Sequence, residues 1–148
     1  MIKNISNLGD AALYCDFGDE VNKEVNNKVI RYFKSIQKEN IDGINNLTPS
    51  YNKLIISFDL RKKNFQTVNK FIENLNVISY DKSESKRIEI PVCCDEKFSL
   101  AIKRLKEKLN LSHDKIYEKF LNKEFFCYMT GFIAGMPFLG DLETELRA

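Results

Sequence analysis

The sequence predicts an α+β fold that opens with a two-layer ββαββα domain. In the first half, short segments with alternating apolar residues are followed by segments in which apolar residues recur at helical spacing. The order is strand, strand, helix, and the same order then follows again. Two helices in this order can cover one face of a mainly antiparallel sheet built from both strand pairs.

The strands of this half are predicted at residues 2–5, 12–17, 44–48 and 53–58. The segment ALYCDF places Leu13, Cys15 and Phe17 on one face. The segment KLIISF at residues 53–58 is apolar enough to be buried on both faces. The second strand pair therefore contributes the most hydrophobic strand of the predicted sheet.

Both helices are predicted to begin after an asparagine, because this side chain caps the free amide groups of a first helical turn. Asn22 precedes one helix, the Asp42–Gly43 pair ends it, and Asn64 precedes the other. The two apolar stripes and the alternating strands predict one shared core, made of Leu13, Phe17, Val29, Phe33, Leu54, Ile56, Phe58, Val68, Phe71 and Ile72.

The predicted domain limits are 1–78 for the two-layer domain, 79–87 for a polar linker and 88–148 for a second domain. In the second domain, the segment RIEIPV at 87–92 is predicted as a strand. Ser99 and Ser112 are each predicted to cap a helix. The aromatic segment 125–133 is predicted as a further strand.

Composition limits the function classes. The chain has 148 residues, a formal net charge of +2 and short apolar runs, so neither nucleic acid nor a membrane is an expected partner. The first residues show no signal peptide, and the expected location is the cytoplasm. Four cysteines without CxxC spacing and a single histidine, His113, predict reduced thiols and no metal site. We expect His113 to be exposed near a helix start.

The stretch CYMTGFIAGMPFLGDL, residues 127–142, concentrates glycines and aromatic residues near the end of the sequence. Glycine allows positive φ angles or a close approach of the backbone to another group. A tight structural corner explains this composition, and so does a surface that meets a ligand or a partner. The residues alone leave both interpretations open.

The same stretch resembles the signature of a known family, in which members typically read YMLGFLPGFPYLGGL. Other landmarks agree in order and spacing: LGDAALYCDFGDEVNKEVNNKV, GINNLTPSYNKLIISFD, IEIPVCCDEKF and LSHDKIYEKF. The first of these contains the family's E-x-N pattern, and the second contains its P-(A/S)-Y pattern. The sequence is similar along its whole length to the family of the 5-oxoprolinase B-type subunit, allophanate hydrolase subunit 1 and the Kip-type inhibitor of a sporulation histidine kinase.

The resemblance implies a cyclophilin-like β-barrel as the second domain, of which this sequence holds the beginning. Family members continue well beyond the position that matches Ala148. Three explanations stay open: the sequence is a fragment, a separate chain completes the barrel, or the protein has lost the role of the barrel. The sequence departs from the family at Phe120, where histidine is usual, at Ala134, where the family has proline, and at Asp95–Glu96, where it has two glycines.

The function implied by the resemblance is that of a carboxyltransferase-domain hydrolase subunit. It would belong to an ATP-dependent 5-oxoprolinase, which opens 5-oxo-L-proline to L-glutamate, or to a related amide hydrolase. Companion subunits, C-like and A-like, are the implied partners in a hetero-oligomer, and ATP is the implied cofactor of the complex. This sequence has no GxxxxGK[ST] loop, so we expect no activity and no tight ATP binding from the chain alone.

The candidate residues for binding substrate or a partner belong to the glycine-rich stretch; they are Tyr128, Gly131, Phe132, Gly135, Met136, Pro137, Phe138 and Gly140. Backbone amides at its glycines are candidates for cradling an anion or a substrate oxygen. Catalytic residues are unknown, with Asp141 only a weak acid–base candidate. The alternative function is a Kip-type regulator that binds and inhibits a histidine kinase, a role that needs an apolar docking surface and no catalytic residues.

Overall fold

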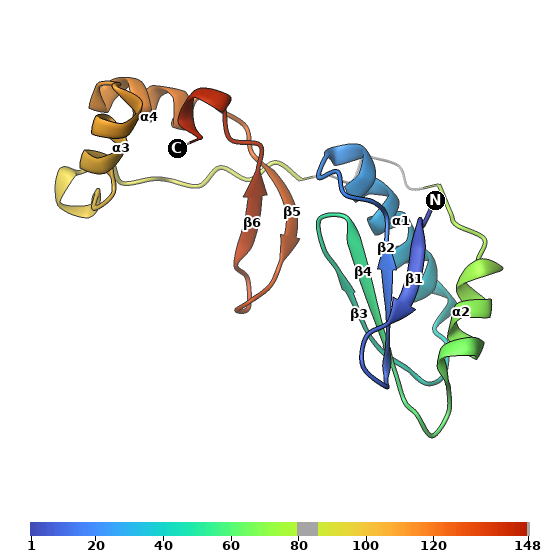
Figure 1. Ribbon diagram of the computed structural model, residues 1–148. Helices are drawn as coiled ribbons and strands as arrows, with labels where there is room; N and C mark the ends of the chain where they lie inside the picture. Colours follow the sequence, from blue (N-terminus) through green and yellow to red (C-terminus); the bar gives the residue numbers. More distant parts are fainter. Residues whose placement is uncertain (80–85, 148) are drawn as a thin grey trace. The chain divides into compact units, whose positions relative to one another are not determined.

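The computed structural model describes residues 1–79 and 86–147, which fall into two compact units (Figure 1). The first unit lies within Met1–Lys82 and Tyr128–Phe138, and the second lies within Ser83–Cys127 and Leu139–Ala148. Most of the predicted linker, residues 80–85, is outside the described residues. The first unit therefore consists of two separate segments of the chain, and the second segment, Tyr128–Phe138, lies in the glycine-rich stretch.

The first unit is a four-stranded antiparallel sheet with two helices (Figure 1). Its elements are β1 (Asn4–Asn7), β2 (Ala12–Asp16), α1 (Lys23–Glu39), β3 (Ile44–Pro49), β4 (Lys53–Phe58) and α2 (Phe65–Glu73). The strand order is β1-β2-β4-β3, with Leu13 of β2 opposite Ile56 of β4. The ββαββα order and the α+β class predicted from the sequence are confirmed.

The helices begin at the predicted caps. Asn22 Oδ1 accepts a hydrogen bond from the Val25 amide at 2.9 Å, which satisfies one of the free amides of the first turn of α1. Asn64 and Thr67 form a reciprocal capping box at the start of α2, with bonds of 2.9 and 3.1 Å. Helix α1 ends earlier than predicted, because Asn40 adopts the left-handed conformation, with φ of 45°, that terminates many helices.

The core lies between the sheet and both helices. Its buried members are Leu13, Cys15, Phe17, Val29, Ile36, Leu54, Ile56, Phe58, Val68 and Ile72. Phe33 and Phe71 pack against this cluster but are only partly buried. All ten predicted core residues therefore belong to one core. The expectation that β4 is buried on both faces is wrong, because Lys53, Ile55 and Ser57 on its other face are only half-buried.

The first strand begins later than the predicted residues 2–5. Its register is fixed by the neighbouring strand, because Asn4 pairs with Asp16 and Asn7 pairs with Leu13. The predicted strand at 125–133 is shorter, β5 (Phe126–Thr130), and is followed by a strand that was not predicted, β6 (Pro137–Gly140). These two strands form a two-stranded sheet (Figure 1).

The prediction of a strand at residues 87–92 is wrong. Among the described residues this segment has no partner strand, and the side chain of Ile88 is 69% exposed. Alternating apolar residues favour a strand, but a strand also needs a neighbour that accepts and donates its backbone hydrogen bonds. Ile90 and Val92 are exposed as well.

The second unit contains η2 (Glu96–Phe98), α3 (Ile102–Leu109), α4 (His113–Leu121) and η3 (Thr144–Leu146). Ser112 caps α4 as predicted, but Ser99 does not cap α3, which begins after Ala101 without a side-chain cap. The Ser99 hydroxyl instead bonds the Asp95 carbonyl oxygen and the Tyr117 hydroxyl. Within the described residues, no helix is both long and apolar enough to cross a membrane.

Candidate functional site

The best-defined cluster of polar and aromatic contacts lies within the first unit, where residues 128–138 of the β5–β6 hairpin pack against α1 and the turn between β3 and β4. Its centre is Asn26 on α1, which is 2% exposed. Its Nδ2 lies 3.0 Å from the carbonyl oxygens of Ser50 and Tyr51 and 3.1 Å from that of Tyr128. One buried amide group thus joins a helix, the turn between β3 and β4, and the hairpin. We call this cluster the hairpin junction.

Aromatic side chains complete the hairpin junction. The rings of Tyr51 and Tyr128 stack with centroids 5.2 Å apart, and Phe138 meets Tyr51 edge-on at 6.5 Å. The Ser50 hydroxyl donates to the Met129 sulfur at 3.2 Å. Tyr128 is buried as a result, so it holds the hairpin in place and its ring does not wall an open site.

The hairpin junction brings together landmarks that are far apart in the sequence. Asn26 comes from the E-x-N pattern, Ser50 and Tyr51 from the PSY pattern, and Tyr128 and Met129 from the glycine-rich stretch. Tyr128 and Phe138 were predicted as site residues from the sequence, whereas Asn26, Ser50 and Tyr51 were not. A detectable signal existed: Asn26 precedes buried Val29 by three positions, which places an amide on the apolar face of α1.

The loop of the hairpin carries the remaining candidates and is mostly exposed. Phe132 is 90% exposed and has a positive φ of 67°, a conformation uncommon outside glycine. Ile133 and Met136 are exposed as well, and Gly135 has a φ of 80°. The loop therefore presents apolar side chains outward, as an interaction surface would. We call residues 132–136 the hairpin loop.

The glycines proposed from the sequence as an anion cradle occupy different places in the hairpin. The Gly131 amide donates to the Met136 carbonyl oxygen at 3.1 Å, so it is used inside the hairpin. Pro137 and Gly140 are the first and last residues of β6; Pro137 is exposed and Gly140 is half-buried. Asp141 follows β6 and is exposed. Gly131, Pro137, Gly140 and Asp141 line neither of the two cavities described for this structure. Tyr128 and Phe138, in contrast, both contact Tyr51.

A second polar cluster forms around Asp16, at the end of β2. Two of its members, Asn52 and Lys53, directly follow Ser50 and Tyr51 of the hairpin junction in the sequence. Asp16 pairs with Lys53 and accepts a bond of 2.7 Å from the Gly18 amide. The hydrogen bond that the Lys53 side chain donates to Asp16, and after it the bond from the Gly18 amide, hold the pKa of Asp16 below its usual value. Asn52 and Lys53 donate to the Gly18 carbonyl oxygen at 2.7 and 2.9 Å. These contacts fix the loop after β2, residues 17–20, because Asp16, Asn52 and Lys53 use their polar atoms to bond Gly18 and one another.

No group of three or more metal-ligating side chains occurs within the described ranges. His113 is half-buried and not exposed as predicted, because its ring packs edge-on against Tyr117 at 4.6 Å. Burial raises the pKa of the Cys15 thiol to about 12, so this thiol is protonated and inert at neutral pH.

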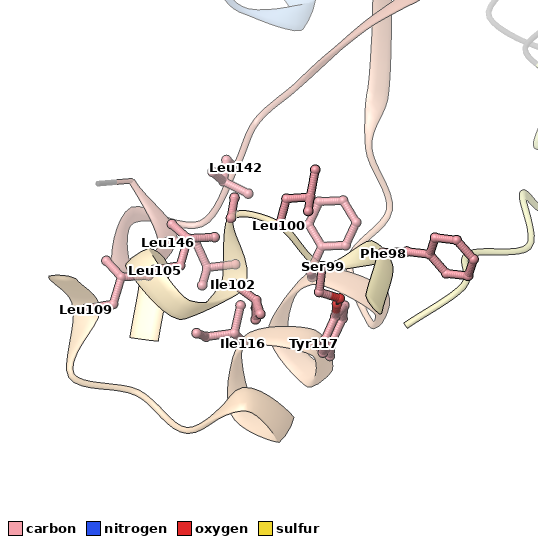
Figure 2. A pocket seen from close by; sticks show the side chains of 12 residues that line it. Phe98, Ser99, Leu100, Ile102, Leu105, Leu109, Ile116, Tyr117, Leu142 and Leu146 are labelled. Carbon is pink, nitrogen blue, oxygen red and sulfur yellow. The ribbon is translucent and has the colours of Figure 1, made fainter. Parts of the chain in front are cut away.

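An apolar cavity of the second unit does not fit a triphosphate. It has a volume of about 500 Å³ and is lined almost entirely by apolar side chains (Figure 2). Its hydroxyls, on Ser99 and Tyr117, bond to each other. A triphosphate needs cationic or amide donors that converge on its oxygens. No step involving ATP is therefore assigned to residues of this cavity.

Fold and site together define an α+β protein in which a glycine-rich hairpin docks on a ββαββα layer through a buried asparagine. The chain belongs to the family described as "Carboxyltransferase domain, subdomain C and D", which matches residues 3–148. The family resemblance noted from the sequence landmarks is thereby confirmed.

Relatives of known name or structure agree with this membership. The chain is 29% identical to the B-type subunit of the 5-oxoprolinase of Bacillus subtilis (strain 168) over 97% of its own length, and it spans 65% of that relative. Two crystal structures of TTHA0988, in space groups P212121 and P6522, match 93% of this chain at 23% identity, with TM-scores of 0.77 and 0.74. The chain covers 27% and 26% of those structures, and the likeness to them concerns the fold.

Proposed function

We propose that this chain acts as a B-type subunit, or part of one, in an ATP-dependent 5-oxoprolinase or a related amide hydrolase. The observation that carries the proposal is the 29% identity to a B-type subunit of 5-oxoprolinase across 97% of the chain. The reaction would open the unreactive ring amide of 5-oxo-L-proline to give L-glutamate: ATP would phosphorylate the amide oxygen and leave as ADP. Water would then attack the activated carbon, with release of phosphate and cleavage of the ring C–N bond. A cytoplasmic location fits a substrate of this kind.

In this proposal the catalytic complex includes companion subunits, C-like and A-like. The support from the structure is the exposed apolar surface of the hairpin loop, together with the exposed segment that carries Ile88, Ile90 and Val92. Such surfaces often mark contacts with another protein. The apolar lining of the cavity in the second unit favours ATP binding at a companion subunit or at a shared surface.

We also propose the domain limits derived from the sequence: residues 1–78 as the two-layer domain, 79–87 as a linker and 88–148 as the start of a cyclophilin-like barrel. Residues 128–138 would then be the part of the second domain that packs on the first. Phe132 and Met136 would contact a partner or substrate, whereas Tyr128 and Phe138 would position the hairpin. The hydrolase subunit is favoured over a Kip-type kinase inhibitor because the curated relative carries the name of the hydrolase subunit.

The test is reconstitution with companion subunits. The chain is produced alone and together with C-like and A-like subunits, and each preparation is assayed for ATP hydrolysis that depends on 5-oxo-L-proline and for glutamate. We expect no turnover by the chain alone and turnover by the mixture. Absence of a stable complex with either companion, or turnover by the chain alone, would contradict the proposal.

A matched pair of variants tests the hairpin loop within that complex. Phe132→Asn removes an exposed ring but keeps a residue that tolerates the positive φ. Leu60→Ser removes an exposed apolar side chain elsewhere in the first unit. We expect the first variant to weaken assembly about tenfold or more, as truncation of an interface anchor does, and the second to leave it unchanged. Equal assembly of both variants would exclude the loop as the contact.

A further inference from the structure

The second unit holds an apolar groove between α3, α4 and η3 that the proposed function does not use. It is the cavity of about 500 Å³ described above (Figure 2). Ile102, Leu105 and Leu109 line it from α3, Ile116 from α4 and Leu146 from η3. Leu100 stands at its edge and is 94% exposed. We call this cavity the helical groove.

The helical groove is incompletely filled by the described residues. Helix α3 has no buried residue, although its three groove-lining side chains follow the i, i+3, i+7 spacing of a helix that packs against neighbours. Ile116 and Leu146, by contrast, are buried. An apolar stripe of this kind is covered in other proteins by the apolar face of a further helix, which inserts side chains at the same spacing.

Charge distinguishes the two sides of α3. At 3.6 residues per turn, Lys106 and Lys108 project roughly 65° and 95° from the centre of the apolar stripe, one on each side. Lys103 and Arg104 project roughly 130° away, on the far side of the helix. Lys106 and Lys108 are exposed, and neither forms an ion pair with another residue that the structure describes. An occupant of the groove would therefore pass between two unneutralised cations.

We propose that the helical groove binds an amphipathic helix of a partner protein whose apolar stripe is flanked by glutamate or aspartate. The apolar stripe would fill the groove, and the acidic flanks would pair with Lys106 and Lys108. A small ligand fits less well, because the hydroxyls of Ser99 and Tyr117 already bond to each other and leave few convergent polar groups. A second copy of α3 fits less well too, because it would place lysines against lysines. This proposal stands independently of the proposed function.

The experiment uses the whole chain and a synthetic 18-residue peptide with leucines at helical spacing, glutamates on both flanks and one tryptophan. The protein contains no tryptophan, so a change in tryptophan fluorescence reports the peptide alone. A second peptide carries lysines in place of the glutamates. We expect the acidic peptide to bind at least about tenfold more tightly than the basic peptide, and this preference to shrink as salt is added. Equal binding of both peptides overturns the proposal.

Two matched protein variants locate the binding site. Lys106→Glu with Lys108→Glu reverses the charges beside the groove, and Lys103→Glu with Arg104→Glu reverses the same number of charges on the far side. We expect the first variant to prefer the basic peptide and the second to keep the original preference. The same response from both variants means that the peptide follows net charge alone, which overturns the proposal.

A fold-neutral variant tests the apolar part of the contact. Leu100→Ser changes a side chain that is 94% exposed, so it leaves the helical unit folded, and circular dichroism checks this. We expect it to weaken binding of the acidic peptide about threefold or more, whereas Leu121→Ser, an exposed residue of α4 outside the groove lining, should not. Unchanged binding by Leu100→Ser overturns the proposal. Sedimentation without peptide tests for a second copy: dimers that exclude the peptide also overturn it.

Discussion

The side-chain amide of Asn26 on α1 donates a hydrogen bond of 3.1 Å to the carbonyl oxygen of Tyr128 on β5, across 102 positions of sequence. This bond and the two that the same amide makes to the turn between β3 and β4 explain why residues 128–138 of the hairpin belong to the first unit. The contact is buried, so its loss leaves carbonyl oxygens without a partner where water has little access.

Asn26→Ala should therefore lower the free energy of unfolding by about 1–3 kcal/mol, the usual cost of leaving buried polar groups unsatisfied. Chemical denaturation followed by circular dichroism measures this change. The control is Asn46→Ala, because the Asn46 side chain is exposed and its amide bonds the Thr48 hydroxyl at 3.1 Å. Equal stability of the two variants would mean that the hairpin junction does not contribute to folding.

Truncation of Ile56 tests the helix-over-sheet core. Ile56→Ala should cost about 2–5 kcal/mol, because Ile56 is fully buried in the core between the sheet and the helices. Phe33→Ala should cost less than its size suggests, because Phe33 is only partly buried. Ile55→Ala, on the half-buried face of β4, is the matched control and should cost clearly less than Ile56→Ala in thermal and urea unfolding. The reverse order would contradict the assigned faces of the sheet.

The Asp16–Lys53 pair makes stability depend on pH in a defined direction. The folded-state pKa of Asp16 is lowered, mainly by the Lys53 side chain, below an unfolded value of about 3.9. The carboxylate therefore stabilises the fold fully above that value, and this stability is lost as the pH falls through the folded-state pKa. Asp16→Asn should destabilise by up to about 1 kcal/mol at pH 7, since the pair is partly exposed.

Urea unfolding of this variant and the parent chain as the pH is lowered checks the sign. The difference in stability should narrow at acid pH, because the parent's carboxyl group is then protonated as well. Asp10→Asn, which changes an exposed carboxylate near the β1–β2 turn, should show no such narrowing. A difference that grows at acid pH would contradict the assignment.

Gly135→Val should abolish binding of a companion subunit while the first unit stays folded. Gly135 has a φ of 80° and open space where a Cβ would lie, so the substitution distorts the backbone of the hairpin loop and creates no clash. Gly9→Val provides the matched control, because Gly9 also has a positive φ, of 64°, and the same open space, but lies in the β1–β2 turn. Both variants and the parent chain are compared by co-purification. Unchanged binding by Gly135→Val would exclude the hairpin loop as the contact.

The elements of the first unit were predicted well, because helix caps and the alternation of apolar residues in strands depend on residues close together in the sequence. Asn22 and Asn64 cap helices, and the alternation around Leu13 and Ile56 fixes which strand faces are buried. The prediction of a strand at residues 87–92 failed, because a strand needs a neighbouring strand to pair with, and no local sequence pattern shows whether one is present. In the site, the glycine-rich stretch indicated Tyr128, but its contacts with Asn26 and Tyr51 depend on tertiary packing. Asn26 and Tyr51 both lie in sequence motifs shared with the family, but no local pattern indicates that they contact Tyr128.

The late position of the hairpin also affects how the chain is made. A ribosome releases the sheet and both helices of the first unit well before Tyr128, so Asn26 and Tyr51 emerge without their hairpin partner. Contacts over so long a sequence separation form slowly, since the ends of a long loop must first meet. During synthesis the nascent chain therefore passes through a stage in which the surface around Asn26 and Tyr51 is uncovered. A chaperone, or the hairpin of another nascent copy, can bind this surface before the chain's own hairpin does.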